Sequence, residues 1–292
     1  MYLQHASAIT RITLIPLLLA LALASGCSSM VARATGNLSD SLSRAVLNQN
    51  DPETVRQGAP TFLLMLDGFI NDDPDNQALL LSGSRLYGAY ASAFVDNEER
   101  QRRLANKAFH YGRRAVCVSH NDFCAVIDKP FVTFKEHVTD FNTGDVPLLF
   151  GFASAWATWI QANSDDWNAT IQLPKVAALM DRVIELDETY NHGNAHLYMG
   201  VLTTQLPPEY GGKPEVGRQH FERANELSAG HNLMVNVLFA KYYARLVFNQ
   251  ELHDKLLNEV LASNTEAPEL TLSNVLAQQQ ARELLEDSHD FF

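Results

Sequence analysis

Apolar residues recur at intervals of three and four positions in almost every segment after residue 36. This spacing collects them on one face of a helix, and the alternation of apolar and polar residues that marks a strand is rare. Helix-start signals agree, because Asp51-Pro52-Glu53 combines a capping residue, a first-turn proline and an early acid. Similar starts lie at Asp75-Asn76, Leu173-Pro174 and Lys213-Pro214. The pattern predicts an all-α fold.

A longer repeat accompanies this periodicity. Three triplets share spacings of four and three residues: Ala105, Phe109 and Gly112; Val176, Met180 and Val183; Gly217, Phe221 and Ala224. The second and third triplets are displaced by 41 positions throughout, and the same shift maps Glu185-Leu186 onto Glu226-Leu227. A weaker fourth set is His253, Leu257 and Val260. A fixed displacement of this kind predicts a helical repeat.

Each triplet follows a predicted helix that carries a small residue three positions before a larger one: Gly83 and Leu86, Gly151 and Ser154, Gly200 and Thr203, Ala240 and Tyr243. Small residues let paired helices approach closely, and the alternation resembles the tetratricopeptide repeat. We expect four antiparallel pairs over Asn76–Ser263, which stack into one α-solenoid because a single pair cannot bury its apolar face. Further helices are expected at Leu38–Asn48, Glu53–Asn71 and Ser273–Asp287.

The first 36 residues follow a different pattern. Arg11 precedes an apolar run, Ile12–Ala24, which is too short for the ~20 residues of a bilayer-spanning helix. A positive flank, a short apolar stretch and small residues form the layout of a secretory signal. The run ends in Ala24-Ser25-Gly26-Cys27, which resembles the bacterial lipobox, although Ala24 stands where Leu is usual. An ordinary signal with a chance cysteine, or an uncleaved helix, is the alternative.

We therefore expect a signal peptide over residues 1–26, lipid attachment at Cys27, a tether over residues 27–36 and a single domain over residues 37–292. Several acyl chains on one cysteine make a durable membrane anchor where one chain does not. By resemblance to Gram-negative lipoproteins, the lack of Asp at position 28 favours export to the outer membrane. The expected location is the periplasmic face of that membrane.

The composition fits a folded chain, since 46% of the 292 residues are hydrophobic and 19% are charged. Lys and Arg number 22 against 34 Asp and Glu, which leaves a formal net charge of −12. A chain this acidic lacks the basic surface of a nucleic-acid binder, so we expect no nucleic-acid partner.

Two further cysteines, Cys117 and Cys124, enclose a polar stretch that we interpret as a loop after a helix. In an oxidising envelope a disulfide is favoured, and the chain-entropy relation gives about 2.5 kcal/mol for so short a ring. The alternative is a metal site built from Cys117, His120, Asp122 and Cys124. Its ligand types are suitable, but a tight Cys-x-x-Cys spacing is absent.

Catalytic motifs are missing from the sequence. We find no Gly-x-Ser-x-Gly elbow, no His-Glu-x-x-His pair and no dinucleotide or P-loop glycine pattern, and we expect no enzyme activity, bound metal or cofactor. The best remaining constellation is Glu188, His192 and His196, whose spacing of four would place them on one helix face. However, Asn191-His192-Gly193-Asn194 is a turn sequence, which should break the helix and scatter the three.

Aromatic residues on the first helices of the pairs have two interpretations. Most aromatics at helical spacing build the core, but Tyr and Trp also suit a half-open binding surface. We expect about a third of them to contact a ligand or partner. The candidates are Tyr87, Tyr90, Trp156, Trp159 and Tyr198. In the later turn, Gly211-Gly212 either simply links two helices or presents Tyr210 and Lys213 as a contact surface.

Several short stretches keep a distinctive order along the chain: Asp51–Pro60, Leu63–Gly68, Leu86–Tyr90, Leu186–Glu188 with His196 and Gly200, Leu206–Pro214 and His220–Ala224. Together they resemble the T-component lipoproteins associated with TRAP transporters. The resemblance extends from about Leu38 to Asn249 and rests on the length and order of the stretches, since no single motif is catalytic.

This resemblance implies a periplasmic, lipid-anchored protein of tetratricopeptide-like helix pairs that assembles as a homotrimer. The implied partner is the solute-binding P-component of a TRAP system, which imports small organic acids or similar anions with an ion gradient. We expect a docking platform whose tether raises the local concentration of the bound receptor. A cavity through the pairs would also take a small organic acid, and the candidate cations are Arg85, Arg113, Arg114 and Lys213.

Two other functions stay open. Outer-membrane lipoproteins with tetratricopeptide pairs also serve as scaffolds in envelope assembly or pilus biogenesis, and their sequences would equally lack catalytic motifs. An enzyme of unfamiliar type would work through Glu188, His192 and His196.

Overall fold

The structure is a computed structural model that describes residues 41, 44–205, 208–210 and 212–292. The chain divides into two compact units, Met1–Ala45 and Val46–Phe292, and the second contains nearly all of the described residues. The predicted signal peptide, Cys27 and the tether lie outside the described residues. The helix predicted at Leu38–Asn48 lies partly outside them, and within it residue 41 and residues 44–47 are helical.

Helices and turns make up the described part of the chain, which contains no β-strand. The predicted all-α fold is therefore confirmed. No described helix is both long enough and apolar enough to cross a membrane.

The first long helix, α2 (Pro52–Asp72), begins where the sequence indicated. The Asp51 side chain accepts a hydrogen bond from the backbone N–H of Glu53, and Pro52 occupies the first turn. Buried apolar residues at Val55, Leu63 and Leu66 recur at the spacing of one helix face, which packs against the next helix.

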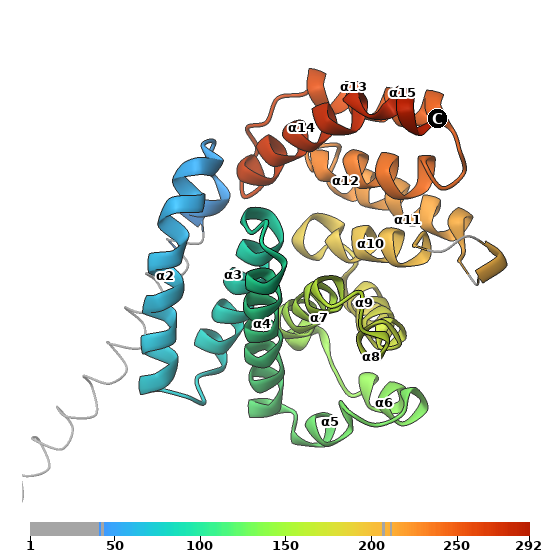
Figure 1. Ribbon diagram of the computed structural model, residues 1–292. Coiled ribbons are helices and arrows are strands. Elements are labelled where there is room, and N and C mark those ends of the chain that lie inside the picture. The colour runs from blue at the N-terminus through green and yellow to red at the C-terminus, as the bar shows by residue number, and fades with distance from the viewer. Residues whose placement is uncertain (1–40, 42–43, 206–207, 211) are drawn as a thin grey trace, which may run out of the picture. The chain divides into compact units, whose positions relative to one another are not determined.

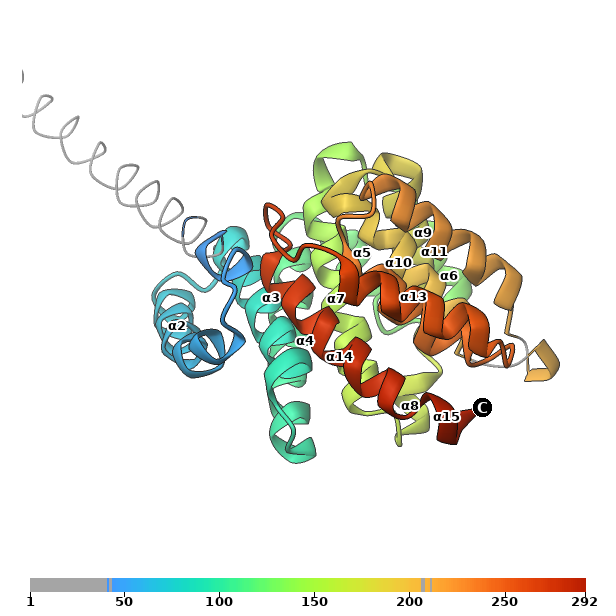
Figure 2. The same ribbon diagram turned by 90° about the horizontal axis from the view of Figure 1, so that it is seen from above.

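Four helix pairs follow α2 (Figure 1). Their members are α3 (Gln77–Phe94) with α4 (Glu98–Ser119), α7 (Val146–Ala162) with α9 (Leu173–Asp187), α10 (Tyr190–Thr203) with α11 (Pro214–Leu227), and α12 (Leu233–Leu238) and its π-helical continuation η3 (Phe239–Ala244) with α13 (Gln250–Ala262). Neighbouring pairs contact each other through α4 and α7, α9 and α10, and α11 and α12. Two further helices, α14 (Thr271–Glu286) and α15 (Ser288–Phe291), end the chain, and Figure 2 shows them from above.

The residues of the repeat lie at the buried contacts between helices. Val176, Met180 and Val183 of α9 are completely buried, and so are Phe221 and Ala224 of α11. In the fourth set, His253, Leu257 and Val260 are also completely buried. The sequence periodicity therefore marks the inner faces of the second helices.

Close approach of helices depends on glycine at the third pair. A Cβ atom added at Gly217 of α11 would lie 2.3 Å from Cγ2 of Thr204 and 3.1 Å from the carbonyl oxygen of Gly200. A Cβ at Gly200 would lie 2.9 Å from the ring of Phe221. These distances are too short for any side chain, so the small residues permit the packing of α10 against α11.

The stretch between Cys117 and Cys124, which we expected to be a loop, is largely helical, because α4 extends to Ser119 and α5 (Asn121–Val126) follows His120. Together with α6 (Phe131–Val138) and the short η1 (Thr143–Asp145), α5 lies between the first two pairs. A disulfide joins Cys117 of α4 to Cys124 of α5, with 5.1 Å between the Cα atoms. The helices form here because they bury large side chains in the core, among them Phe123, Val126, Phe134 and Val138.

Two hydrophobic clusters meet at α10. The larger one extends from α2 to α10, where it includes Ala195 and Met199, and it also takes in Leu272 of α14, whereas the smaller one extends from α10 to α14 and includes Leu197. Because α10 contributes to both clusters, the position of this helix depends on both halves of the 46–292 unit.

Candidate functional site

The first residues of α10 contain a strained turn that breaks the helix. Asn191, His192 and Gly193 all have positive φ angles, of 49°, 59° and 73°. A left-handed backbone costs a residue other than glycine roughly 1–2 kcal/mol. Gly193 also lacks space for a side chain, because an added Cβ would lie 2.8 Å from Leu227. The predicted helix break is confirmed, and its strain indicates that surrounding contacts hold it in place.

The turn does not scatter the predicted constellation in the way that the sequence suggested. Oε2 of Glu188 lies 3.4 Å from Nε2 of His196, although the two residues stand on opposite sides of the turn. Among the described residues, His192 forms no hydrogen bond or ion pair with either of them, so only two of the three residues come together. The expectation of complete separation was wrong because a left-handed turn reverses the chain and folds its two sides against each other.

Two residues of α11 complete this cluster. Arg223 donates to both carboxylate oxygens of Glu188, at 2.6 and 3.2 Å. Nδ1 of His196 lies 2.9 Å from Nδ1 of His220, so one imidazole donates the proton and the other accepts it. The sequence analysis did not propose His220 or Arg223 as site residues. Their spacing of three, which places both on one face of α11, could have indicated that they act together. We call these four residues the histidine–carboxylate cluster.

Burial sets the charge state of the cluster. Burial, together with a smaller effect of the nearby His196, lowers the pKa of His220 to about 4. Burial also lowers the pKa of His196, against the opposing effect of Glu188. The hydrogen bonds from Arg223 hold the pKa of Glu188 below its usual range. At neutral pH the cluster therefore contains one ion pair and two neutral imidazoles.

Tyr190, immediately before the strained turn, contacts Arg85 of α3. Nη2 of Arg85 donates to the Tyr190 hydroxyl at 3.0 Å and to the carbonyl oxygen of Pro147, in the first turn of α7, at 2.6 Å. Gly151 makes room for the guanidinium, because an added Cβ there would lie 3.1 Å from Nε of Arg85. The exposed side chain of Arg85 is thereby held against α7 and α10.

A row of aromatic rings begins at Tyr190. Phe150 of α7 makes edge-on contacts with Tyr190 and Tyr198, with ring centroids 5.5 and 5.8 Å apart. Burial raises the pKa of Tyr198 to about 12, and the neighbouring Ser154 hydroxyl has a smaller opposite effect. We call Arg85, Phe150, Ser154, Tyr190 and Tyr198 the Arg85 surface. It combines a cation, aromatic rings and hydroxyl groups from three helices.

Comparison with known protein families matches residues 48–292 to the TRAP transporter T-component family. The chain belongs to this family. Among curated proteins, an uncharacterized protein of Treponema pallidum (strain Nichols) is 22% identical over 281 residues, which cover 88% of this chain and 85% of that protein. The family is that of a transporter accessory component, and the strained turn, the histidine–carboxylate cluster and the Arg85 surface all lie within the matched residues.

Three of the aromatic candidates in this T-component lie in the core. Tyr87, Tyr90 and Trp156 are at most 5% exposed. Their polar atoms bond to protein groups: the Tyr87 hydroxyl to Asp67, the Tyr90 hydroxyl to the carbonyl of Arg56, and the indole N–H of Trp156 to Gln172. Of the two interpretations of the aromatic residues, these three therefore fit the structural one. A partner could touch them only if the helices came apart.

The other candidates lie nearer the surface. Trp159 is half-buried, stacks on Phe109 with centroids 5.2 Å apart, and donates its indole N–H to Asn106. Lys213 is exposed immediately before α11. Tyr210 lies in the short helix η2 (Pro208–Tyr210). These three residues are not brought together with the Arg85 surface by any described contact.

The two remaining candidate cations already have partners. Arg113 forms an ion pair with Asp128, and Arg114 donates to the carbonyl oxygen of Pro74. The alternative metal site also loses its thiolates, because both cysteines are in the disulfide. Over the described residues, no three His, Cys, Asp or Glu side chains converge in an arrangement that could hold a metal ion.

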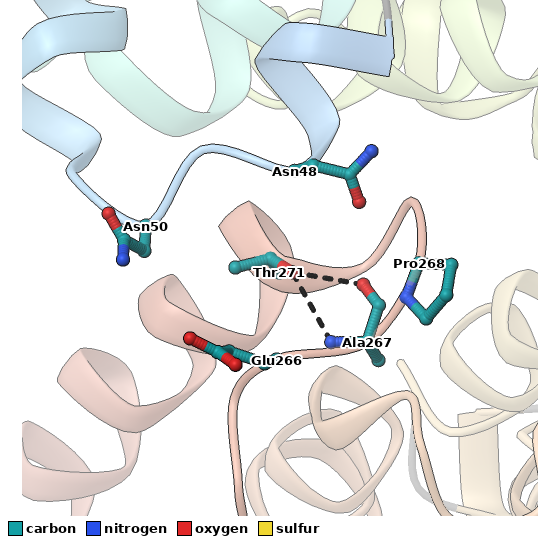
Figure 3. A pocket seen from close by; sticks show the side chains of 6 residues that line it. All are labelled: Asn48, Asn50, Glu266, Ala267, Pro268 and Thr271. Carbon is teal, nitrogen blue, oxygen red and sulfur yellow. Dashed lines mark hydrogen bonds between the residues drawn. The ribbon is translucent and has the colours of Figure 1, made fainter.

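A pocket of about 360 Å³ lies elsewhere, between the segment before α2 and the segment before α14 (Figure 3). Asn48 and Asn50 line one side, and Glu266, Ala267, Pro268 and Thr271 line the other. The Thr271 hydroxyl is already bonded to the backbone of Ala267. With no aromatic ring and no cation in its lining, this pocket has little to offer an anionic or apolar ligand.

Proposed function

We propose that this T-component is a lipid-anchored periplasmic lipoprotein of the outer membrane that binds the solute receptor, or P-component, of a TRAP transporter. The family match over residues 48–292 carries the proposal, because it makes the chain an accessory component of a TRAP transporter. The signal-like segment and the lipobox-like sequence ending at Cys27 support the anchor.

The receptor would dock on the segment that connects α10 to α11. In both views, η2 lies at the outer end of this helix pair, away from the packed helices (Figures 1 and 2). At the base of the segment, the backbone N–H of Lys213 donates to the carbonyl oxygen of Thr203 at 2.8 Å. The hydrogen bond between Lys213 and Thr203 holds the two ends of the segment together, and η2 lies away from the packed helices. A partner could therefore bind there without disturbing the helices.

The anchor and the oligomer complete the proposed docking function. A lipid on Cys27 confines the protein to a membrane surface and raises the effective concentration of a bound receptor there. A homotrimer would present three copies of the docking segment. We also propose that a small organic acid reaches the T-component during this exchange.

Receptor capture tests the docking function. Tagged full chain is incubated with periplasmic extract, and retained proteins are identified by mass spectrometry. We expect a solute-binding protein to be retained, and we expect the double variant Tyr210→Ala, Lys213→Ala to bind it about tenfold more weakly with unchanged helical content and melting. Lys255→Ala, an exposed lysine of α13, is the matched control and should bind normally.

The outcomes separate the alternatives. Retention of envelope-assembly or pilus proteins in place of a solute receptor would replace the proposal with the scaffold function. Equal binding by the double variant would refute the docking segment but not the family function. For the anchor, labelled fatty acid should attach to the wild-type chain and not to Cys27→Ser.

A further inference from the structure

We infer that the Arg85 surface binds the carboxylate of a small acid that has an apolar body. The inference rests on the proposed function, from which we expect a solute to reach this chain. It goes further because it names the binding site and the chemistry of the ligand. The site is formed by α3, α7 and α10, and the row of rings is the reason for expecting an apolar body.

The first argument is charge. Most described arginines pair with a carboxylate, for example Arg56 with Glu53, Arg182 with Glu185 and Arg245 with Asp287. No carboxylate of the described residues lies within ion-pair distance of Arg85. The chain has a net charge of −12, so most of its cations have a carboxylate available to them. At an arginine without an acidic neighbour, an external anion does not have to displace a carboxylate of the protein.

The second argument is preorganisation. Both hydrogen bonds of Arg85 to the described part of the chain come from Nη2, so its Nε and Nη1 donors have no acceptor there. The bonds to Pro147 and Tyr190 fix the plane of the guanidinium, and less side-chain freedom is then lost when an anion binds. A carboxylate accepts two parallel N–H bonds from such a group.

The third argument is the apolar surrounding of the cation. Tyr190 and Tyr198 are half-buried, and Phe150 packs against both rings. A partly covered tyrosine ring contacts an apolar body with one face, while the hydroxyls of Tyr190 and Tyr198 stay bonded to Arg85 and Ser154. By contrast, the histidine–carboxylate cluster has its own ion pair, and the pocket in Figure 3 has no cation.

Calorimetry with two probes of the same shape tests the inference. The full chain in lipid nanodiscs is titrated with phenylacetate and with the neutral phenylacetamide, and empty nanodiscs provide the blank. We expect phenylacetate to bind at least about tenfold more tightly than phenylacetamide, and more tightly than succinate, which lacks the apolar body.

Variants assign the binding to the Arg85 surface. Arg85→Gln should weaken phenylacetate binding about tenfold, and Arg85→Lys should retain part of it because the charge remains. Tyr190→Phe should weaken it about threefold through looser positioning of the guanidinium. Arg114→Gln is the matched control, because Arg114 also bonds a backbone carbonyl on the surface, and it should bind normally.

Either of two results would overturn the inference: wild-type protein that binds phenylacetate no better than phenylacetamide, or Arg85→Gln that binds it like the wild type. Unchanged melting of Arg85→Gln shows that a loss of binding is not a loss of folding. Receptor capture is measured on the same variants. If the chain binds phenylacetate in an Arg85-dependent way but captures no receptor, the docking function alone is refuted. If it captures the receptor but does not bind phenylacetate in that way, this inference alone is refuted.

Discussion

Two carboxylates connect helices in different parts of the 46–292 unit, and their partners differ. Asp67 of α2 accepts hydrogen bonds from the hydroxyls of Tyr87 and Tyr111, each at 2.8 Å, and from the ammonium of Lys107. Glu188, after α9, accepts from Arg223 and lies beside His196. The Asp67 side chain is 19% exposed and that of Glu188 is 39% exposed.

The difference lies in what acid does to the partners. Burial and the bond to Asp67 raise the pKa of Tyr87 and of Tyr111 well above the ordinary value, so both phenols stay protonated across the physiological range. Burial tends to raise the pKa of Asp67, but its hydrogen bonds outweigh burial and the net pKa is lowered. The Asp67 network therefore keeps its charges, whereas the histidine–carboxylate cluster gains protons in mild acid.

The largest expected effect is on Asp67. Asp67→Asn removes the negative charge that two hydroxyls and an ammonium share, and we expect the free energy of unfolding to fall by about 2–3 kcal/mol in urea denaturation. Asp72→Asn, an exposed acid on the same helix, is the control and should change it by less than about 0.5 kcal/mol. Equal effects of the two variants would contradict a structural role for this network.

A smaller loss is expected at the strained turn. Gly193→Ala places a Cβ at a φ of 73° and 2.8 Å from Leu227, so we expect the free energy of unfolding to fall by about 1–2 kcal/mol. Gly230→Ala is a useful comparison, because its φ is also 73° but nothing lies within 4 Å of the added atom. A larger loss at Gly230 than at Gly193 would show that packing against Leu227 does not hold the turn.

The pH dependence of stability separates the two networks. The histidines have lowered pKa values in the folded chain, about 4 for His220 against 6.5 when unperturbed, so the unfolded chain binds more protons between these values. Stability should therefore fall as pH decreases from about 6.5 to 4. The pKa of Asp67 lies below its ordinary value of 3.8, so the stability that its charge contributes is lost only below that pH, as pH falls through the lowered pKa.

Melting scans across this range measure the effect. His220→Gln should flatten part of the slope between pH 6.5 and 4, because one of the two imidazoles of the cluster no longer titrates, while His196 and His110, whose pKa values burial also lowers, still contribute. His289→Gln replaces a fully exposed histidine and should leave the slope as it is. An unchanged slope in His220→Gln would assign the acid sensitivity to other groups.

The smallest effect is expected for Glu188→Gln at neutral pH, since the ion pair with Arg223 is partly exposed and such pairs contribute little to stability. The midpoint of urea unfolding should decrease less than in Asp67→Asn. With the charge removed, the pKa of His196 should fall further, which histidine NMR titration detects. If Glu188→Gln lowered the free energy of unfolding as much as Asp67→Asn does, the two carboxylates would not differ in their contribution to stability.

Much of the fold could be predicted because its signals are local. The cap at Asp51, the prolines that open α9 and α11, and the break after Tyr190 each depend on residues within one helical turn. The four pairs followed from the same kind of pattern, repeated along the chain. By contrast, α5 and α6 have only six and eight residues, too few to show a helical pattern in the sequence, and the burial of a few large side chains stabilises them as helices.

The sequence by itself determined where most helices begin, that they pair, and that the helix breaks at residues 191–193, near the start of α10. The tertiary structure alone decided which side chains meet: Asp67 with Tyr111, Glu188 with Arg223, and Arg85 with Tyr190, which is 105 residues away. The physical reason is range. Helix formation depends on neighbours up to four positions away, whereas these contacts depend on how several packed helices orient each other, and no local pattern encodes that orientation.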